Sequence, residues 1–386
     1  MRIALIAHHV APLRPPFVGG VESFTWYLAR WLAGRGHRVR LYAPPGTEVP
    51  GVDVRPLRLD AGLSDAARQD VSMPPGRFMD AHHAYLETVM ELAASTEHDV
   101  VHSNTLHYLP IALGSLVGTP MVTTLHTPPT PWLESALRAA VRCGSPPALV
   151  AVSRATRDAW RSVTGPVPVV HNGVDTAAWR PGPGGGGAVW CGRIVPEKAP
   201  HLAIDACRRA GVPLRLAGPI IDRAYWDREI APRVGIDAEH VGHLDHDALQ
   251  AELGRARVAV VSPAWDEPFG LVAAEAMACG TPVAGFARGG LVRLVGRHGG
   301  RLVAPGDVPA LARAIDAAAA LDRAAVRRHV ERTASLDVMG RAYERLYAAT
   351  IGSGAAAVRP PAPVEDLAAH RVRRGRAVRP LPVTAT

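Results

Sequence analysis

The stretch "HNGVDTAAWRPGPGGGG" (171–187) interrupts an otherwise regular pattern and divides the chain into two parts. It opens with an Asn-Gly turn signal, and its proline- and glycine-rich end, residues 181–187, favours flexible coil over helix or strand. We therefore expect residues 171–187 to be a hinge linker between a first unit, residues 1–170, and a second unit, residues 188–335.

Both units alternate short apolar runs with helical segments, which is typical of parallel sheets covered by helices. The apolar runs predict strands at residues 2–7, 38–43, 99–103, 120–125, 148–153 and 167–170, and then at 188–191, 214–218, 257–263, 281–285 and 301–305. The clearest helix is residues 21–33, which a glycine follows. The expected fold class is α/β, with two Rossmann-like, doubly wound domains that face each other across a cleft. Ligands of such sheets bind beyond the carboxyl ends of the strands, so functional residues should lie in strand-to-helix loops.

Two segments follow the second unit. Residues 336–351 have the periodicity of an amphipathic helix, and residues 352–386 are rich in glycine, alanine, proline and arginine, which is typical of a disordered basic tail. The tail holds six arginines and two acids, about half of the formal net charge of +8. Because the remaining arginines are interspersed with acids, we expect no nucleic-acid partner; contact of the tail with an anionic membrane stays a hypothesis.

The composition is that of a globular protein, with 48% hydrophobic and 20% charged residues among 386. The cysteines at positions 143, 191, 207 and 279 are far apart and form no Cys-x-x-Cys motif, so we expect reduced thiols and a cytoplasmic location. No apolar run approaches the length of a membrane span, and the apolar run at the N-terminus is too short for a signal peptide.

The segment "WCGRIVPEKAP" (190–200) holds the only lysine of the chain. Arg193 and Lys198 lie between an expected strand and an expected helix, where free backbone amides and the helix dipole favour an anion. A guanidinium grips phosphate oxygens in a bidentate way, whereas an ammonium is a compact charge on a flexible stem. The pair suits a diphosphate. The alternative is two solvated cations, with Lys198 in surface contact with Glu197.

A second segment with this chemistry is "AWDEPFGLVAAEAMACGTPVAG" (264–285). Pro268 suits the first position of a helix that ends at Cys279. Other residues of the loop and helix form an expected ligand site: the amides of Phe269, Gly270 and Leu271 as a second anion cradle, and the carboxylates of Glu267 and Glu275 as acceptors for sugar hydroxyls. Together they suit a nucleotide sugar. Alternatively, the two glutamates are a favourable acid at the helix start and a surface residue.

The first unit offers fewer candidates. Gly19 and Gly20 lie between the first strand and the helix at 21–33, where backbone amides could face a ligand, although a merely flexible loop is the alternative. His126 directly follows the strand at 120–125 and so lies at the expected cleft edge; a lone histidine is more often structural.

Residues 1–350 resemble the retaining family-4 glycosyltransferases of the GT-B fold. Four motifs carry the resemblance: "GGVESFTWYLARWLAGRGHRV", "HNGVD", "GRIVPEK" and "EPFGLVAAEAMACGTPVAG". The resemblance implies that Arg193 and Lys198 hold the donor diphosphate and that Glu267 contacts the transferred sugar. Further implied roles are sugar and phosphate contacts by Phe269, Gly270 and Leu271, a ribose contact by Glu275, a place beside the donor sugar for His126, and a nucleobase contact by the loop at 241–249 with Leu244.

The resemblance has two departures. Arg293 stands where the family often has a glutamate after a glycine pair, and Ala199 stands where a glycine often follows the phosphate lysine. The first bears on loop packing or acceptor contacts.

The expected activity is therefore retaining transfer of a sugar from a nucleotide-diphosphate sugar, with a UDP-sugar favoured, to a hydroxyl on a small-molecule, lipid or glycan acceptor. We expect no cofactor and no metal. Asp245-His246-Asp247 could suggest a metal, but Asp245 suits a helix N-cap better. A nucleotide-sugar epimerase of similar fold and a non-catalytic nucleotide-sugar-binding protein remain alternatives. The oligomeric state does not follow from the sequence.

Overall fold

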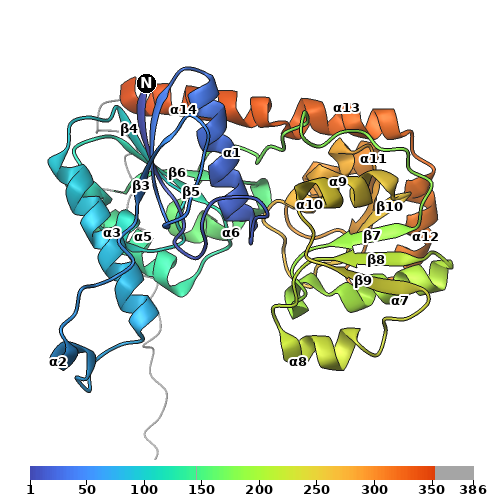
Figure 1. Ribbon diagram of the computed structural model, residues 1–386. Coiled ribbons are helices and arrows are strands. Elements are labelled where there is room, and N and C mark those ends of the chain that lie inside the picture. Colours follow the sequence, from blue (N-terminus) through green and yellow to red (C-terminus); the bar gives the residue numbers. More distant parts are fainter. Residues whose placement is uncertain (145, 353–386) are drawn as a thin grey trace, which may run out of the picture.

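The computed structural model describes residues 1–144 and 146–352. It contains two six-stranded sheets, ordered β3-β2-β1-β4-β5-β6 and β12-β11-β10-β7-β8-β9, in which the paired strands are parallel. Figure 1 shows the two sheets side by side, each with helices on its faces. The predicted α/β, doubly wound fold class is therefore confirmed.

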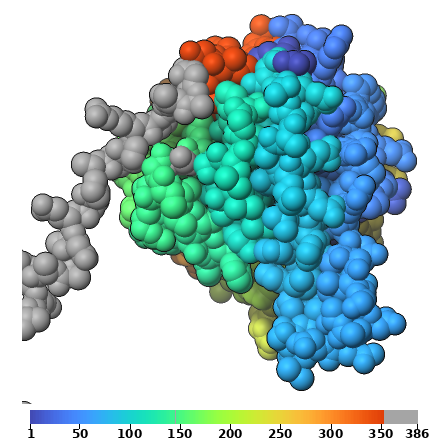
Figure 2. Space-filling view, turned by 90° about the vertical axis from the view of Figure 1, so that its left-hand side faces the viewer, coloured from blue at the N-terminus to red at the C-terminus, as the bar shows by residue number. Residues whose placement is uncertain are grey.

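The first sheet is formed by residues 2–151. Its strands are β1 (Arg2–Ile6), β2 (Arg38–Ala43), β3 (Asp53–Pro56), β4 (Val100–Ser103), β5 (Met121–Leu125) and β6 (Ala148–Ala151). Its helices are α1 (Gly20–Gly34), α2 (Asp65–Arg68), α3 (Gly76–Ala94), α4 (Leu109–Ala112), α5 (Pro131–Arg142) and α6 (Arg154–Thr164). In Figure 2, which views this side of the molecule, α3 runs along the surface in cyan and the segment that contains α2 projects at its lower end.

The second sheet is formed by residues 188–303. Its strands are β7 (Ala188–Cys191), β8 (Leu214–Ala217), β9 (Ala238–Gly242), β10 (Val258–Val261), β11 (Val283–Phe286) and β12 (Gly300–Val303). Its helices are α7 (Pro200–Ala210), α8 (Arg223–Tyr225), α9 (His246–Arg255), α10 (Leu271–Ala278), α11 (Leu291–Gly299), α12 (Val308–Ala319) and α13 (Arg323–Ala334). In the described part of the chain, no helix is both long and apolar enough to cross a bilayer.

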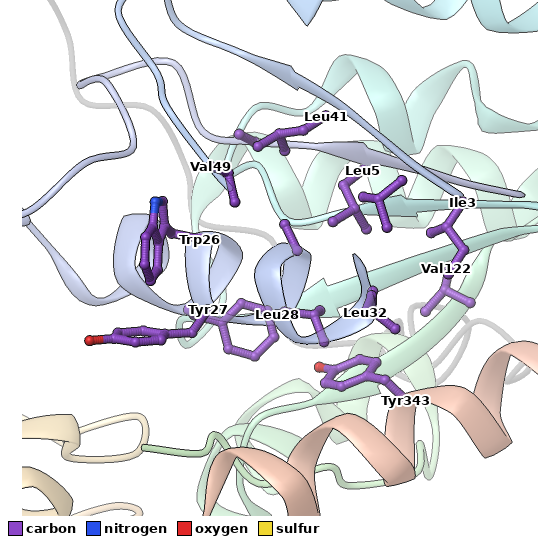
Figure 3. Close-up of a cluster of buried hydrophobic side chains, with 14 of the residues drawn as sticks. Ile3, Leu5, Trp26, Tyr27, Leu28, Leu32, Leu41, Val49, Val122 and Tyr343 are labelled. Carbon is purple, nitrogen blue, oxygen red and sulfur yellow. The ribbon is translucent and has the colours of Figure 1, made fainter. Parts of the chain in front are cut away.

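The final helix, α14 (Leu336–Gly352), packs back on the first sheet. Figure 3 shows Tyr343 beside Leu28 and Leu32 of α1 and Ile3 of β1 in one apolar cluster. Buried hydrogen bonds also fix the position of α14 on the sheet. His102 on β4 bonds the Tyr347 hydroxyl at 2.7 Å and the Thr124 hydroxyl on β5 at 2.7 Å. The helix expected at 336–351 therefore forms, and its last residue, Gly352, was assigned to the tail. Residues 353–386 of the predicted tail lie outside the described residues.

The chain passes between the two sheets twice, and the two passes touch. Val174 forms a parallel bridge with Ser335, and a Cβ built on Gly173 would lie 2.5 Å from the Ser335 carbonyl oxygen. Residues 182–186 are fastened to the second sheet, because the amides of Gly184 and Gly186 donate to the carbonyls of Gly254 and Arg255. These bonds hold part of the segment against the second sheet, and the hinge at residues 171–187 stays a prediction.

Three strand predictions need correction. Residues 167–170 contribute only an isolated bridge at Val169 and no named strand. β3 and β9 were not expected, since charged or polar residues interrupt the apolar residues in "DVRP" and "AEHVG". Both lie at sheet edges, where one side faces solvent and an apolar sequence is not required.

Candidate active site

A cleft of about 500 Å³ lies between the carboxyl ends of the two sheets. In each sheet the strand order reverses at one point, between β1 and β4 in the first and between β7 and β10 in the second. Ligands of doubly wound sheets bind at this switch point. Every site residue predicted from the sequence lines the cleft: Gly19, Gly20, His126, Arg193, Lys198, Leu244, Glu267, Phe269, Gly270, Leu271 and Glu275.

Lys198 is held in an ion pair inside this cleft. Its Nζ lies 2.5 Å from Glu267 Oε2, and the side chains are 23% and 13% exposed. Trp265 supports both partners, since its indole N–H donates to the same carboxylate oxygen at 3.3 Å and its ring lies 5.4 Å from the ammonium. Because a partly buried charge needs a partner, the carboxylate of Glu267 holds the ammonium of Lys198 in place within the cleft.

The loops that follow β7 and β10 are bonded to each other. The Ala264 amide donates to the Glu197 carbonyl at 2.8 Å, and the Ser262 hydroxyl donates to the Ala199 carbonyl at 3.0 Å. These contacts follow from topology, since β7 and β10 are neighbouring strands. The predicted meeting of the Arg193–Lys198 loop with the Glu267–Glu275 segment is therefore confirmed. The surface contact of Lys198 with Glu197 does not form; Lys198 pairs with Glu267 instead.

Arg193 differs from Lys198 in having no tight partner. Its guanidinium lies 3.8 Å from Glu197 and its side chain is 43% exposed. Both features leave the planar fork free to bind a ligand in a bidentate way.

The start of α10 differs from the prediction. Pro268 is not the first helical residue, because the helix begins at Leu271 after a left-handed Gly270 with φ of 98°. A glycine pair packs against this loop: the Gly290 amide donates to the Glu267 carbonyl at 2.7 Å, and a Cβ on Gly289 would lie 2.2 Å from that oxygen.

This start leaves three backbone amides available. Within residues 1–144 and 146–352, the amides of Phe269, Gly270 and Leu271 donate no hydrogen bond. They lie at the positive end of α10, as an anion cradle requires. Arg293, the first departure from the family pattern, is exposed on α11 and does not line the cleft.

Glu275 lies one turn into α10, not two as expected from a helix starting at Pro268. Burial raises the pKa of its carboxyl to about 7. Its side chain has no hydrogen-bond or ion-pair partner among the described residues, although it lines the cleft. An acceptor of this kind suits ligand hydroxyls.

The first unit contributes a carboxylate that was not predicted. Glu22 on α1 is 6% exposed and lines the cleft; burial raises the pKa of its carboxyl, and the charge of Arg193 opposes that rise. Gly19 leaves room for this carboxylate, because a Cβ on it would lie 2.7 Å from Glu22 Oε2. Gly20 serves a close approach of the two units, since its Cβ would lie 3.1 Å from Leu271. The "GGVE" motif could have indicated Glu22 as a site residue, because it places an acid close to a glycine pair that follows a strand.

His126 lies at the cleft edge, as predicted, in an apolar pocket. Its Nε2 bonds Asn104 Oδ1 at 3.1 Å, and the ring of Phe24 is 4.7 Å away. Burial lowers its pKa to about 3, and the pKa of His8 is likewise lowered to about 3. Both rings are therefore neutral near pH 7 and weak as bases.

Leu244 lies in the short loop between β9 and α9. Asp245 caps α9 by accepting from the Ala248 amide at 2.9 Å, which agrees with the N-cap interpretation. In the described residues, no three His, Cys, Asp or Glu side chains are grouped so as to hold a metal ion. The cysteines of this part of the chain are free, and Cys207 and Cys279 are buried.

Comparisons with known proteins find similarity to glycosyltransferases over both units. The family description "Glycosyltransferase Family 4" matches residues 18–178, and "Glycosyl transferases group 1" matches residues 188–334. A glycogen synthase of Mycobacterium tuberculosis (strain CDC 1551 / Oshkosh) is 31% identical over 85% of this chain and 89% of that protein. A D-inositol 3-phosphate glycosyltransferase of Stackebrandtia nassauensis is 29% identical over 84% of this chain and 87% of that protein.

Solved structures are similar in fold. A sucrose-phosphate synthase from Thermosynechococcus elongatus has a TM-score of 0.74 at 23% identity, over 91% of this chain and 99% of that chain. HepE of Anabaena, in complex with UDP and glucose, has a TM-score of 0.69 at 19% identity, over 90% of this chain and 100% of that chain. The fold and the cleft define an enzyme of the GT-B glycosyltransferase class. The chain belongs to the family-4 glycosyltransferases, as its motifs indicated.

Proposed function

We propose that this glycosyltransferase is a retaining enzyme that moves a sugar from a nucleotide-diphosphate sugar, with a UDP-sugar favoured, to a hydroxyl acceptor without a metal ion. The observation that carries the proposal is the pairing of two loops at the β7–β10 switch point. One loop supplies Arg193 and Lys198, and the other supplies Glu267 and the free amides of residues 269–271.

The cations act on the leaving group. When the bond between the sugar C1 and the phosphate oxygen breaks, negative charge grows on the departing diphosphate. Lys198, Arg193 and the amide end of α10 are fixed around the space for that charge, and donors fixed in advance stabilise a transition state strongly. These protein cations would neutralise the charge on the diphosphate, a role that a metal ion could otherwise fill. This supports the metal-independent form of the proposal.

The remaining site residues would orient the donor. Glu267 is positioned to accept from hydroxyls of the transferred sugar, Glu275 from the ribose, and the loop with Leu244 to lie against the base. His126, as a neutral ring bonded to Asn104, would lie beside the sugar. Lys198 would then share its ammonium between Glu267 and phosphate.

Retention follows if the acceptor attacks from the side that the diphosphate leaves. The acceptor oxygen forms the new bond to C1, and its proton passes to the departing phosphate oxygen. His8 and His126 are poor rivals for that proton because the pKa of each is lowered to about 3. Glu22 is the rival base, since a buried carboxylate with a raised pKa could serve an inverting reaction.

One experiment separates these possibilities. The purified protein is screened by thermal shift against UDP, ADP and GDP and their glucose and mannose conjugates, and ¹H NMR of the product then reports the anomer. We expect a shift with UDP conjugates in EDTA and an α-linked product from an α-linked donor. A β-linked product that Glu22→Gln abolishes would establish inversion. Turnover without an acceptor to a second nucleotide sugar would indicate an epimerase, and binding without turnover a binding protein.

The partners are then the donor and an acceptor that enters from the first unit. We also propose a cytoplasmic location, which the free cysteines support.

A further inference from the structure

A strip of aromatic and histidine rings leads away from the cleft over the first unit. It runs between the β1 and β4 loops and the helices α3 and α5, and it is formed by His9, Phe78, His82, His107, Tyr108 and Trp132. None of these residues belongs to the donor site described above. We refer to them as the aromatic strip.

The strip is continuous with the cleft. His8, which lines the cleft, has its ring 4.7 Å from that of His9. The path continues from His9 to His107 at 6.2 Å, from His107 to Tyr108 at 4.8 Å, and from Tyr108 to Trp132 at 5.3 Å. The last two contacts are stacked, with interplanar angles of 24°. A chain-like ligand could therefore follow it outward from the reacting centre.

The strip is partly exposed to solvent, although Tyr108 also packs against the core of the first unit. Trp132 is 59% exposed, and the other members are partly exposed. Tyr85 fixes the strip from below: its ring stacks on His107 at 4.6 Å, and its hydroxyl donates to the Ala7 carbonyl at 2.9 Å. Contiguous exposed rings held in place in this way mark a binding surface.

The strip also carries uncharged polar groups. His107 Nε2 is buried without a hydrogen-bond partner, and the Tyr108 hydroxyl bonds His82 Nδ1 at 3.0 Å. Burial lowers the pKa of His107 to about 4, with smaller contributions from His9 and His82, and burial also lowers the pKa of His9. On α3, Arg77 is exposed and Asp80 accepts from the Ala61 amide.

We propose that the aromatic strip binds the acceptor and that this acceptor is an uncharged glycan. A pyranose ring has an apolar face of C–H groups and an edge of hydroxyls, which suits flat rings interspersed with neutral imidazole and phenol groups. A phosphorylated acceptor would need cations that the strip does not supply. A lipid chain would leave the imidazole nitrogens unpaired, at a cost. The inference rests on the proposed function, because it takes the cleft as the place of transfer.

The test uses binding first and transfer second. The protein is applied to an immobilised panel of neutral glucans, mannans and galactans together with phosphorylated mono- and disaccharides and polyprenyl phosphate. We expect neutral glycans to bind. We expect Trp132→Ala and Tyr108→Ala each to weaken that binding about tenfold or more, as truncation of an aromatic anchor does, and Trp132→Phe to restore most of it.

The matched control is Leu116→Ala, because Leu116 is 64% exposed on the same unit but is not part of the strip. It should bind as the unchanged protein does. In transfer assays with the best glycan, Trp132→Ala should raise the acceptor KM and leave the donor KM and the thermal shift with nucleotide unchanged.

Three results would overturn the inference: hits confined to phosphorylated or lipid probes, no glycan hit at all, or binding that Trp132→Ala and Tyr108→Ala leave intact. Because the nucleotide thermal shift is measured in parallel, its absence would instead count against the proposed donor site. The two failures can thus be told apart.

Discussion

The two walls of the cleft differ in the kind of chemistry they present. The second unit offers charged groups: an ammonium paired with a carboxylate, a guanidinium loosely paired with Glu197, and the amide end of α10. The first unit offers neutral histidines and aromatic rings, with Glu22 as its buried acid. In the proposed function, the wall of the second unit would stabilise the charge of the leaving group, and the wall of the first unit would bind an uncharged acceptor. The predictions below test that division, from the largest expected effect to the smallest.

Removal of the lysine should have the largest effect. Lys198→Ala should lower kcat by about 10²–10³, because a fixed donor at the developing charge is lost. Lys198→Arg should recover only part of the activity, because a guanidinium spreads its charge over a larger planar group and does not place a compact charge where the ammonium lies. Steady-state transfer assays measure both. Full activity of Lys198→Ala would contradict the role of the charged wall.

Neutralising Glu267, the ion-pair partner of Lys198, should have opposite effects on nucleotide binding and on the rate of sugar transfer. Glu267→Gln should lower kcat by about tenfold or more and keep or tighten nucleotide-diphosphate binding, because the ammonium no longer divides its attraction between carboxylate and phosphate. Calorimetric titration with the diphosphate and kinetic assays give the two numbers. Weaker diphosphate binding with normal kcat would contradict this prediction and show that Glu267 contributes to binding and not to the transition state of transfer.

A methyl group added at Gly19 should lower activity indirectly, because it should displace the carboxylate of Glu22. Gly19→Ala places a Cβ 2.7 Å from Glu22 Oε2 and should displace that carboxylate, lowering kcat/KM several-fold. The matched control is Gly34→Ala at the other end of α1, where a Cβ meets nothing within 4 Å. Equal activity of the two variants would show that the position of Glu22 does not matter.

The raised pKa of Glu275 predicts a stability change with pH. The folded carboxyl titrates near 7 and the unfolded one near 4.5, so between these values the folded state holds more protons and stability falls as pH rises. Glu275→Gln removes this cost. Urea unfolding should show the variant gaining about 1 kcal/mol relative to the unchanged protein between pH 5 and pH 8, after allowance for solvent screening. A difference independent of pH would refute the assignment.

The smallest effect is expected at Ala199. Its φ of 45° is left-handed, and it is the non-glycine residue with positive φ in the described chain. A glycine would relieve about 1 kcal/mol of backbone strain but would lose part of that gain to the entropy of the unfolded chain. Ala199→Gly should therefore raise the free energy of unfolding by less than about 1 kcal/mol. A clear loss of stability would show that the alanine methyl packs more strongly than the strain costs.

Much of the donor wall could be predicted from the sequence, because its determinants are local. A loop after a strand and before a helix is recognisable in "CGRIVPEK", and the parallel sheet brings the β7 and β10 loops together. The start of α10 could not be predicted, since it depends on Gly289 and Gly290, some twenty residues away in the chain. Glu22 was missed because its burial results from contact between units.

The acceptor wall was less predictable for a related reason. The strip draws His9, His82, His107 and Trp132 from four separate segments, and no spacing in the sequence links them. The structure places aromatic rings beside His9 and His82, which the positions of these histidines in the sequence do not indicate.

The most direct test is a crystal structure of the protein with a bound nucleotide diphosphate, soaked without divalent metal. The account predicts that the diphosphate lies at the β7–β10 switch point, with its oxygens in hydrogen-bond contact with Lys198 Nζ, Arg193 and the amides of residues 269–271. A diphosphate bound elsewhere, or bound there without contact to Lys198 or those amides, would contradict it.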